Sequence, residues 1–315
     1  MRTDSLAPAS RRARPYHAAM SDMVLGIIGG SGLGERLAGE FGASMQPVEV
    51  DTPFGRPSGP ILTGDLLGTR VAFLARHGAG HLLNPSAVPY RANIFALKTL
   101  GVTHLIASGA TGSLREHIHP GDIVLVDQFI DKTIGRARTF YDHAAVHVEF
   151  AEPVCPVMRR WLANAAAAEG LTFHNGGTYV CMEGPAFSTR AESEMHRAWG
   201  GDLIGMTALP EARLAREAEI AYALIGIPTD YDCWRPVSEG VPRESLLSEI
   251  IGNLNRASEA SVRLIRAALR DPAPLRNTPS PAHEALALAI WSDKSRLDPA
   301  EVRRLRPLWH RRLRP

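Results

Sequence analysis

The sequence predicts an α/β protein with one central sheet flanked by helices. Short apolar runs alternate with segments of helical periodicity from Val24 to Leu269, and this alternation is typical of α/β folds. The chain has 315 residues, 45% of them hydrophobic, which is enough to bury the core of one such domain. No internal repeat is visible in residues 23–269, and a chain of this length accommodates one α/β domain or two smaller ones.

Strands are predicted where short apolar runs occur, and helices where a capping residue precedes apolar residues at helical spacing. Thr189 and Glu192 have the spacing of a capping box at the start of one helix. In chain order, the predicted strands are 24–29, 70–75, 103–107, 123–130, 177–182 and 221–227. The predicted helices are 87–100 with Ser86 as cap, 155–169, one beginning at 189, 210–220 and 244–269.

The two ends differ from this body. Residues 1–22 lack periodicity and are predicted to be a disordered tail. Prolines mark a linker after 269, and residues 270–315 are predicted to form a Pro- and Arg-rich extension with short helices, one of them over 283–291. The ends together carry a net charge of +7 and the body −5. Because a nucleic-acid-binding protein shows a basic face on the folded domain itself, nucleic acid is not an expected partner.

Two further observations bear on the cellular setting. No apolar run reaches the ~18 residues of a membrane span, and no segment has the layout of a secretory signal, so no membrane partner is expected. The three cysteines predict neither a disulfide framework nor a zinc site, which favours the reducing cytoplasm. His117 and His119 have a spacing found in metal sites, but turn residues surround them and no further ligand set accompanies them.

The most informative stretch is Thr229-Asp230-Tyr231-Asp232-Cys233-Trp234. It follows the apolar run 221–227 and places two carboxylates at the carboxyl end of a strand, where open α/β sheets bind ligands. Two acids with no obvious cation beside them indicate proton chemistry or recognition of a donor-rich ring, such as an adenine edge. Taken alone, the stretch is explained more simply as a solvated acidic turn.

Other strand and helix ends carry groups suited to an anion. The glycine-rich segment 26–34 offers backbone N–H groups and the Ser31 hydroxyl, but its spacing does not match the dinucleotide fingerprint, which argues against a nicotinamide enzyme. Arg76 and His77 end a strand and offer donors to phosphate. Ser188 and Thr207 add hydroxyl groups near predicted helix starts. A structural turn or cap explains each group alone, but together they predict an anion site.

Several motifs occur together and in order: Gly29-Gly30-Ser31-Gly32-Leu33, Asp51-Thr52-Pro53-Phe54-Gly55, Ala75-Arg76-His77-Gly78, Gly112-Ser113-Leu114-Arg115, Glu183-Gly184-Pro185, Met206-Thr207, Pro210-Glu211-Ala212 and the stretch from Thr229 to Trp234. The chain closely resembles the trimeric purine nucleoside phosphorylase family over about residues 24–269. The resemblance implies a single-domain purine nucleoside phosphorylase-like fold with a mixed central sheet. It also implies a homotrimer or a dimer of trimers, no metal or organic cofactor, and inorganic phosphate as co-substrate.

The activity implied by the resemblance is phosphorolysis of the N-glycosidic bond of S-methyl-5′-thioadenosine. The products are adenine and 5-methylthioribose 1-phosphate, so the enzyme is expected to be a pentosyltransferase of purine and methionine salvage. Two alternatives stay open: a phosphorylase of other purine nucleosides, such as adenosine or methylthioinosine, and a non-catalytic nucleoside-binding protein.

The resemblance also assigns roles by matched position. The expected phosphate-binding residues are Ser31, Arg76, His77, Gly109, Ala110, Ser188 and Thr207. The expected nucleoside-binding residues are Phe187, Met206, Asp230, Tyr231, Asp232, His147 from a neighbouring subunit, Leu246 and Leu247. Asp230 is the expected catalytic residue because a protonated carboxyl donates to N7 and accepts from the 6-amino group of adenine. Ser188 and Arg243 are the expected specificity positions.

Three departures from the family bear on these expectations, and one of them is conservative, since Ser31 stands where the relatives carry threonine. Gly109 stands where the relatives carry threonine, so one hydroxyl donor to phosphate is expected to be missing. Arg243 stands where they carry an apolar residue, which leaves the tolerance of the 5′ pocket for bulkier or polar groups open.

Overall fold

The computed structural model describes residues 23–30, 33, 36–37, 45–236, 242–309 and 311–313. The predicted N-terminal tail, Ser31 and the side chain of Arg243 lie outside the described residues.

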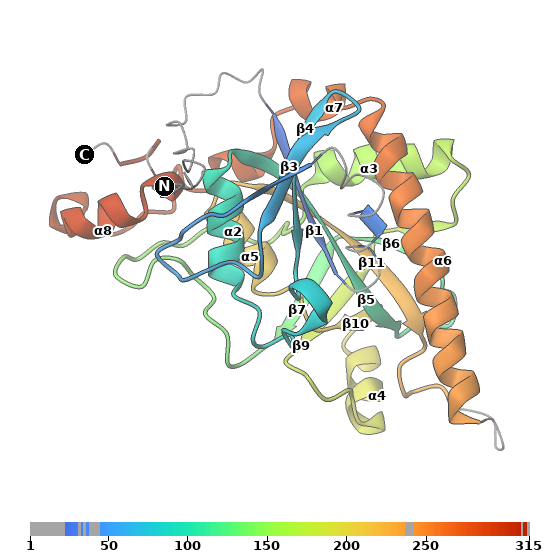
Figure 1. Cartoon of the computed structure of the whole chain (residues 1–315). Helices are drawn as coiled ribbons and strands as arrows, with labels where there is room; N and C mark the ends of the chain where they lie inside the picture. Colours follow the sequence, from blue (N-terminus) through green and yellow to red (C-terminus); the bar gives the residue numbers. More distant parts are fainter. Residues whose placement is uncertain are drawn as a thin grey trace, which may run out of the picture.

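Within the described residues, a mixed sheet of 11 strands forms the centre of the fold (Figure 1). Strand β5 lies in its middle, where it pairs in parallel with β1 and β11, while its end pairs with the antiparallel β10. The strands are β1 (Val24–Gly29), β2 (Gln46–Val48), β3 (Ile61–Leu66), β4 (Thr69–Ala75), β5 (Val102–Ser113), β6 (Ile123–Val126), β7 (Gln128–Lys132), β8 (Phe173–Asn175), β9 (Thr178–Met182), β10 (Leu203–Gly205) and β11 (Ala221–Asp230).

Helices cover both faces of the sheet (Figure 1). One face packs against α2 (Tyr90–Thr99) and α5 (Glu211–Glu217); the C-terminal α9 (Arg306–Trp309) packs on α2, and α8 (Pro299–Arg304) packs on α9. The other packs against α3 (Pro156–Ala168), α6 (Arg243–Leu269) and α7 (Ala273–Asn277). Helix α4 (Arg190–Ala198) and the 3₁₀ turns Ala79–His81 and Lys294–Arg296 belong to neither layer, whereas the 3₁₀ turn Pro281–Glu284 contacts β11 and buries Ala282. None of the described helices combines the length and apolarity needed to cross a bilayer.

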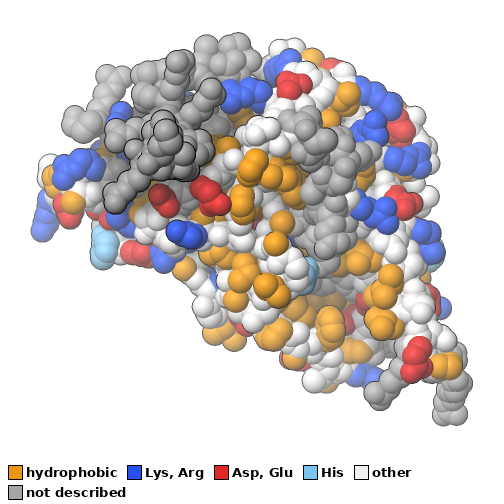
Figure 2. Space-filling model, in the orientation of Figure 1, with side chains coloured by type: hydrophobic (Ala, Val, Ile, Leu, Met, Phe, Trp, Pro, Cys, Tyr) orange, Lys and Arg blue, Asp and Glu red, His pale blue; other side chains and the backbone are white. Residues whose placement is uncertain are grey.

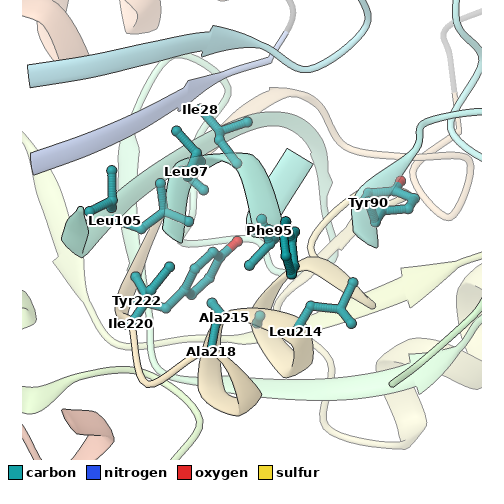
Figure 3. Close-up of a cluster of buried hydrophobic side chains, with 14 of the residues drawn as sticks. Ile28, Tyr90, Phe95, Leu97, Leu105, Leu214, Ala215, Ala218, Ile220 and Tyr222 are labelled. Carbon is teal, nitrogen blue, oxygen red and sulfur yellow. The ribbon is translucent and has the colours of Figure 1, made fainter. Parts of the chain in front are cut away.

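The core consists of two large hydrophobic clusters, one on each face of the sheet. Figure 3 shows part of the first, where Leu97 and Phe95 of α2 and Ala215 of α5 pack near Leu105 and Tyr222 of the central strands. Strands buried on both faces carry near-continuous apolar runs. This explains why β1 and β11 could be predicted directly from the sequence.

Several predicted elements are confirmed, including β1, β11, α3, the capping box of α4 and α6. Others are corrected. Strand β5 continues to Ser113, so Gly109 and Ala110 lie within it and not after it. The predicted strand 123–130 is two strands, because the chain leaves β6 before Asp127 and β7 pairs with β9. Ser86 does not cap α2, which begins at Tyr90; its hydroxyl donates to Glu183 instead.

The predicted helix over 283–291 is also wrong. A 3₁₀ turn ends at Glu284, and Ile290 forms an isolated bridge with Val146. The extension nevertheless packs closely on the body: Trp309 is 1% exposed and stacks on Tyr141 with ring centroids 5.0 Å apart. Arg312 donates to the buried Glu219 at 2.7 Å, so apolar packing and an ion pair both hold the extension in place.

Candidate active site

A cavity of about 460 Å³ opens at the carboxyl ends of the parallel strands β1, β4 and β11 and beside the last third of β5. Because these strands run in parallel, the residues that follow each of them meet at one edge of the sheet. The cavity brings together ten of the residues assigned from the sequence: Arg76, His77, Gly109, Ala110, Phe187, Met206, Thr207, Asp230, Asp232 and Leu247. Arg76 and Asp230 therefore face one common space.

Arg76 is fully buried and held in a fixed orientation. Its guanidinium donates to both carboxylate oxygens of Glu211 at 2.7 and 2.9 Å and to the carbonyl of Ser108 at 2.6 Å. Burial opposes the charged form, but the charge and hydrogen bonds of Glu211 hold the pKa of Arg76 above its usual value. Of the five N–H groups of a guanidinium, these three bonds use three, so two are left for an anion in the cavity.

Backbone and hydroxyl groups surround this guanidinium. A β-carbon at Gly30 would lie 2.7 Å from the Ser108 carbonyl and 2.8 Å from Arg76 Nη1, so the close approach of the three segments requires glycine there. A β-carbon at Gly109 would lie 3.5 Å from Thr207 Oγ1. The threonine expected from the family would therefore place its side chain beside Thr207, and glycine leaves that space unoccupied by a hydroxyl.

His77 is neutral at physiological pH. Burial lowers its pKa to about 4. Its Nδ1 lies 2.7 Å from the carbonyl oxygen of Leu83, which only accepts, so Nδ1 carries the proton. Nε2 of the neutral ring is then an acceptor, which suits the hydroxyl of a hydrogen phosphate ion. The ring of His81 stacks on His77 at 4.1 Å between centroids and lines the same cavity.

Asp230 is the last residue of β11, which extends beyond the predicted 221–227, and Asp232 lies in the turn that follows the strand. Asp230 Oδ1 accepts the N–H of Asp232 at 2.7 Å, and Asp230 Oδ2 lies 2.7 Å from Thr229 Oγ1. Burial, together with the neighbouring charge of Asp232, raises the pKa of Asp230, so this carboxyl has an increased tendency to keep its proton. A β-carbon at Gly112 would lie 3.3 Å from Asp230 Oδ1 and 3.1 Å from Asp232 Cβ, so glycine makes room for both side chains.

Arg136 holds the backbone on which Met206 lies. Its guanidinium donates to the carbonyls of Met206 at 2.6 Å, Leu209 at 2.8 Å and Glu183 at 2.6 Å. The Glu183 carboxylate in turn accepts N–H groups of Ile134 and Gly135 and the Ser86 hydroxyl. These bonds outweigh the effect of burial and lower the pKa of Glu183 to about 2. Hydrogen bonds thereby connect the loops that contain Ser86, Ile134 and Glu183.

The open side of the cavity is apolar. Leu247 and Ile250 of α6 line it, and Leu247 is 59% exposed. Phe187, on the loop before α4, is 85% exposed. Hydrophobic side chains gather over the middle and lower part of the face shown in Figure 2, beside α6.

Other residues assigned from the sequence lie apart from the cavity lining. Ser188 Oγ lies 3.8 Å from Met182 Sδ, and its carbonyl accepts the Cys233 thiol. Tyr231 packs against Trp234 and the guanidinium of Arg235. His147 is exposed and its ring contacts Trp291. Leu246 is partly buried on α6 without lining the cavity. Ser31 and the Arg243 side chain lie outside the described residues.

Sequence reasoning missed the partners that orient the site residues. Glu211 belongs to one of the motifs, but nothing in the sequence shows that it is the carboxylate that the fully buried Arg76 requires. The Tyr222 hydroxyl donates to the same carboxylate at 2.9 Å. Ser193, whose hydroxyl donates to Asp232 Oδ2, carried no signal beyond its place on a predicted helix. In the described part of the chain, no group of three or more His, Cys, Asp or Glu side chains is placed to hold a metal ion.

Comparison with known proteins relates this geometry to a family. The Phosphorylase superfamily model matches residues 24–270. The S-methyl-5′-thioadenosine phosphorylase of Synechocystis sp. is 45% identical over 293 residues, covering 92% of this chain and 87% of the relative. The crystal structure of a methylthioadenosine phosphorylase from an antarctic soil metagenomic library has a TM-score of 0.79 and 43% identity, covering 91% of this chain and 99% of its own. The Schistosoma mansoni methylthioadenosine phosphorylase in complex with adenine has a TM-score of 0.76 and 35% identity, covering 85% and 99%.

Proposed function

Because the chain belongs to the phosphorylase superfamily, within its S-methyl-5′-thioadenosine phosphorylases, we propose that it cleaves S-methyl-5′-thioadenosine with inorganic phosphate to adenine and 5-methylthioribose 1-phosphate. One observation carries the proposal: a charged arginine suited to an anion and an aspartate of raised pKa suited to a purine line the same cavity of about 460 Å³. The relatives described above act on this nucleoside according to their names.

In the proposed reaction, an oxygen of hydrogen phosphate bonds to C1′ of the sugar as the C1′–N9 bond breaks. Both electrons of the broken bond go to the purine, and Asp230 transfers its proton to N7, so that neutral adenine leaves. The proton released as the phosphate ester forms returns to Asp230 through solvent. Arg76, His77 and Thr207 hold the phosphate, so the protein contributes mainly positioning and electrostatic stabilisation.

Asp230 also accounts for the choice of base. A protonated carboxyl donates to N7 and accepts from the 6-amino group of adenine, whereas a 6-oxopurine presents an acceptor that an amide serves better. The raised pKa of Asp230 supports this role. Inorganic phosphate is the co-substrate in this proposal, which requires no metal or organic cofactor.

The proposal includes a homotrimer. Besides Phe187 at the cavity, four large apolar side chains of the described residues are more than 70% exposed: Leu82 at 86%, Ile134 at 87%, Leu288 at 90% and Trp291 at 73%. Burial of such side chains between subunits is favourable. His147, beside Trp291, is then available to a neighbouring subunit's 5′ pocket. Light scattering after gel filtration measures the subunit number. The proposal also includes a reducing, cytoplasmic setting, which the three free cysteines support.

The decisive experiment identifies products after incubating S-methyl-5′-thioadenosine with the protein, with and without phosphate. Adenine release that requires phosphate, together with 5-methylthioribose 1-phosphate, is the expected result. Asp230→Asn is expected to lose most activity on this substrate and to shift preference toward methylthioinosine. Base release without phosphate, or an unchanged preference in the variant, contradicts the proposal.

A further inference from the structure

His81 lines the cavity but has no role in the function proposed above. Its ring lies over the ring of His77, with the centroids 4.1 Å apart and an interplanar angle of 24°. The side chain is exposed, and within the described residues its ring nitrogens form no hydrogen bond. An exposed side chain of this kind contributes little to the stability of a fold, so its placement over His77 has another explanation.

The loop that carries His81 closes on His77. The Leu83 N–H donates to the His77 carbonyl at 3.1 Å, and His77 Nδ1 donates to the Leu83 carbonyl at 2.7 Å. Between these two residues, the His81 N–H donates back to the Gly78 carbonyl at 3.3 Å. The closed loop therefore returns the His81 side chain to the residue from which the loop departs.

The backbone of this loop is left-handed at three of the four residues 78–81. The φ angle is 71° at Gly78, 69° at Gly80 and 57° at His81. Glycine adopts such angles readily, whereas a residue with a β-carbon does so at a cost in conformational energy. Strain of this kind persists where the surrounding structure enforces it, and it is typical of functional sites. Here it accompanies the face-to-face placement of two imidazole rings.

The stack restrains a movement of His77 that its hydrogen bond leaves free. Leu83 fixes Nδ1 within the plane of the ring, so the ring can still tilt about this bond. A second ring packed on its face opposes that tilt. The direction of Nε2, the acceptor for hydrogen phosphate in the proposed reaction, therefore depends on both contacts. Site residues need such support, because a displacement of about 1 Å can cost much of the rate.

We propose that His81 is a positioning residue: by stacking on His77 it holds Nε2 of that ring toward the phosphate, and it does not itself bind the anion. This rests on the proposed function, because it concerns the phosphate that attacks C1′.

Calorimetric titration with inorganic phosphate, without nucleoside, tests the proposal independently of turnover. His81→Asn removes the ring, and asparagine tolerates the left-handed backbone. This variant is expected to bind phosphate about 3- to 10-fold more weakly than the wild type, the effect of one stacked pair of rings, and to keep its Tm in phosphate-free buffer. His119→Asn is the matched control, because His119 is 67% exposed and lies outside the cavity lining; it is expected to bind phosphate as the wild type does.

Steady-state kinetics distinguish a positioning role from a direct contact. His81→Asn is expected to lower kcat/KM for phosphate and to leave the KM for S-methyl-5′-thioadenosine within about 2-fold of the wild type. His81→Phe keeps a ring over His77 but has no nitrogen, so it is expected to recover most of the phosphate affinity. If a nitrogen of His81 bound the phosphate directly, His81→Phe would be as weak as His81→Asn.

A double-mutant cycle shows whether His81 acts through His77. In the His77→Gln background the stacked partner is absent, so His81→Asn is expected to lower kcat/KM for phosphate by less than about 2-fold. Because kcat/KM is measured without saturation, weak phosphate binding in this background does not prevent the comparison. A contact of His81 with the anion, or a general effect on the fold, gives the same fold loss in both backgrounds.

The outcomes separate the two proposals. If the wild type neither binds phosphate nor releases adenine when phosphate is present, the proposed function and the role of His81 both fail. If it does both, unchanged phosphate binding by His81→Asn, or an equal loss in the two His77 backgrounds, overturns only the role of His81. Should His81→Phe lower the Tm, since phenylalanine tolerates the left-handed backbone less well, the double-mutant cycle decides.

Discussion

The replacement Glu211→Gln tests whether Arg76 depends on its buried partner. Glu211 accepts two N–H groups of Arg76 at 2.7 and 2.9 Å, and the two side chains are only 1% and 0% exposed. The change leaves the guanidinium charge in the interior without a counter-charge. Removing one partner of a buried pair costs about 3–5 kcal/mol, which lowers the Tm of a chain of this size by about 5–15 °C.

Phosphate supplies the missing counter-charge if it binds at Arg76. In the wild type, Glu211 already offsets the guanidinium charge, so an arriving anion gains less. We therefore expect saturating phosphate to raise the Tm of Glu211→Gln by more than it raises the Tm of the wild type. Differential scanning fluorimetry measures both shifts, with chloride replacing phosphate at equal ionic strength.

A phosphate-induced shift that is equal in the two proteins would refute this reasoning, because Arg76 would then not contact the anion. Glu259→Gln is the matched control. Glu259 is 62% exposed and pairs with the partly exposed Arg36. Exposed pairs contribute about 0–1 kcal/mol, so the control is expected to change neither stability nor the response to phosphate appreciably.

Two further predictions concern stability. Trp309→Ala is expected to lower the free energy of unfolding by about 3–5 kcal/mol, because the indole is 1% exposed and stacks on Tyr141. Urea denaturation measures this free energy. A loss below about 1 kcal/mol contradicts a structural role for the extension. Burial raises the pKa of Glu217 to about 7 from an ordinary value of 4.5, so its contribution to stability is present below pH 4.5 and is lost as pH rises through 7. Glu217→Gln is expected to remove this loss, raising stability at pH 8 by at most about 3 kcal/mol and little at pH 5, as thermal melts at both pH values show.

Much of the fold was predictable because its signals are local. Strands β1 and β11 are apolar throughout, and the capping box of α4 lies within four consecutive residues. Errors arose where tertiary pairing overrides local pattern. Strand β5 continues through glycines and small residues that read as a loop, because β11 and β10 pair with it to its end. The segment 283–291 has helical composition, but Ile290 pairs with Val146.

In the candidate site, too, local sequence predicted some residues and only the tertiary structure identified their partners. The sequence placed Arg76, His77, Thr207 and Asp230 at the ends of elements, and those side chains line one cavity. Their partners could not be read from the chain. Glu211 is 135 residues from Arg76, and nothing in the local pattern links the two.

The sequence alone predicts the α/β class, the order of most elements and the residues able to hold an anion and a purine. It also shows the family that the chain resembles. Only the folded chain decided that Arg76 is charged yet already paired, that His77 is neutral, and that Asp230 has a raised pKa. The physical reason is that side-chain type and spacing are properties of the chain, whereas charge state depends on burial and on partners brought together from distant positions.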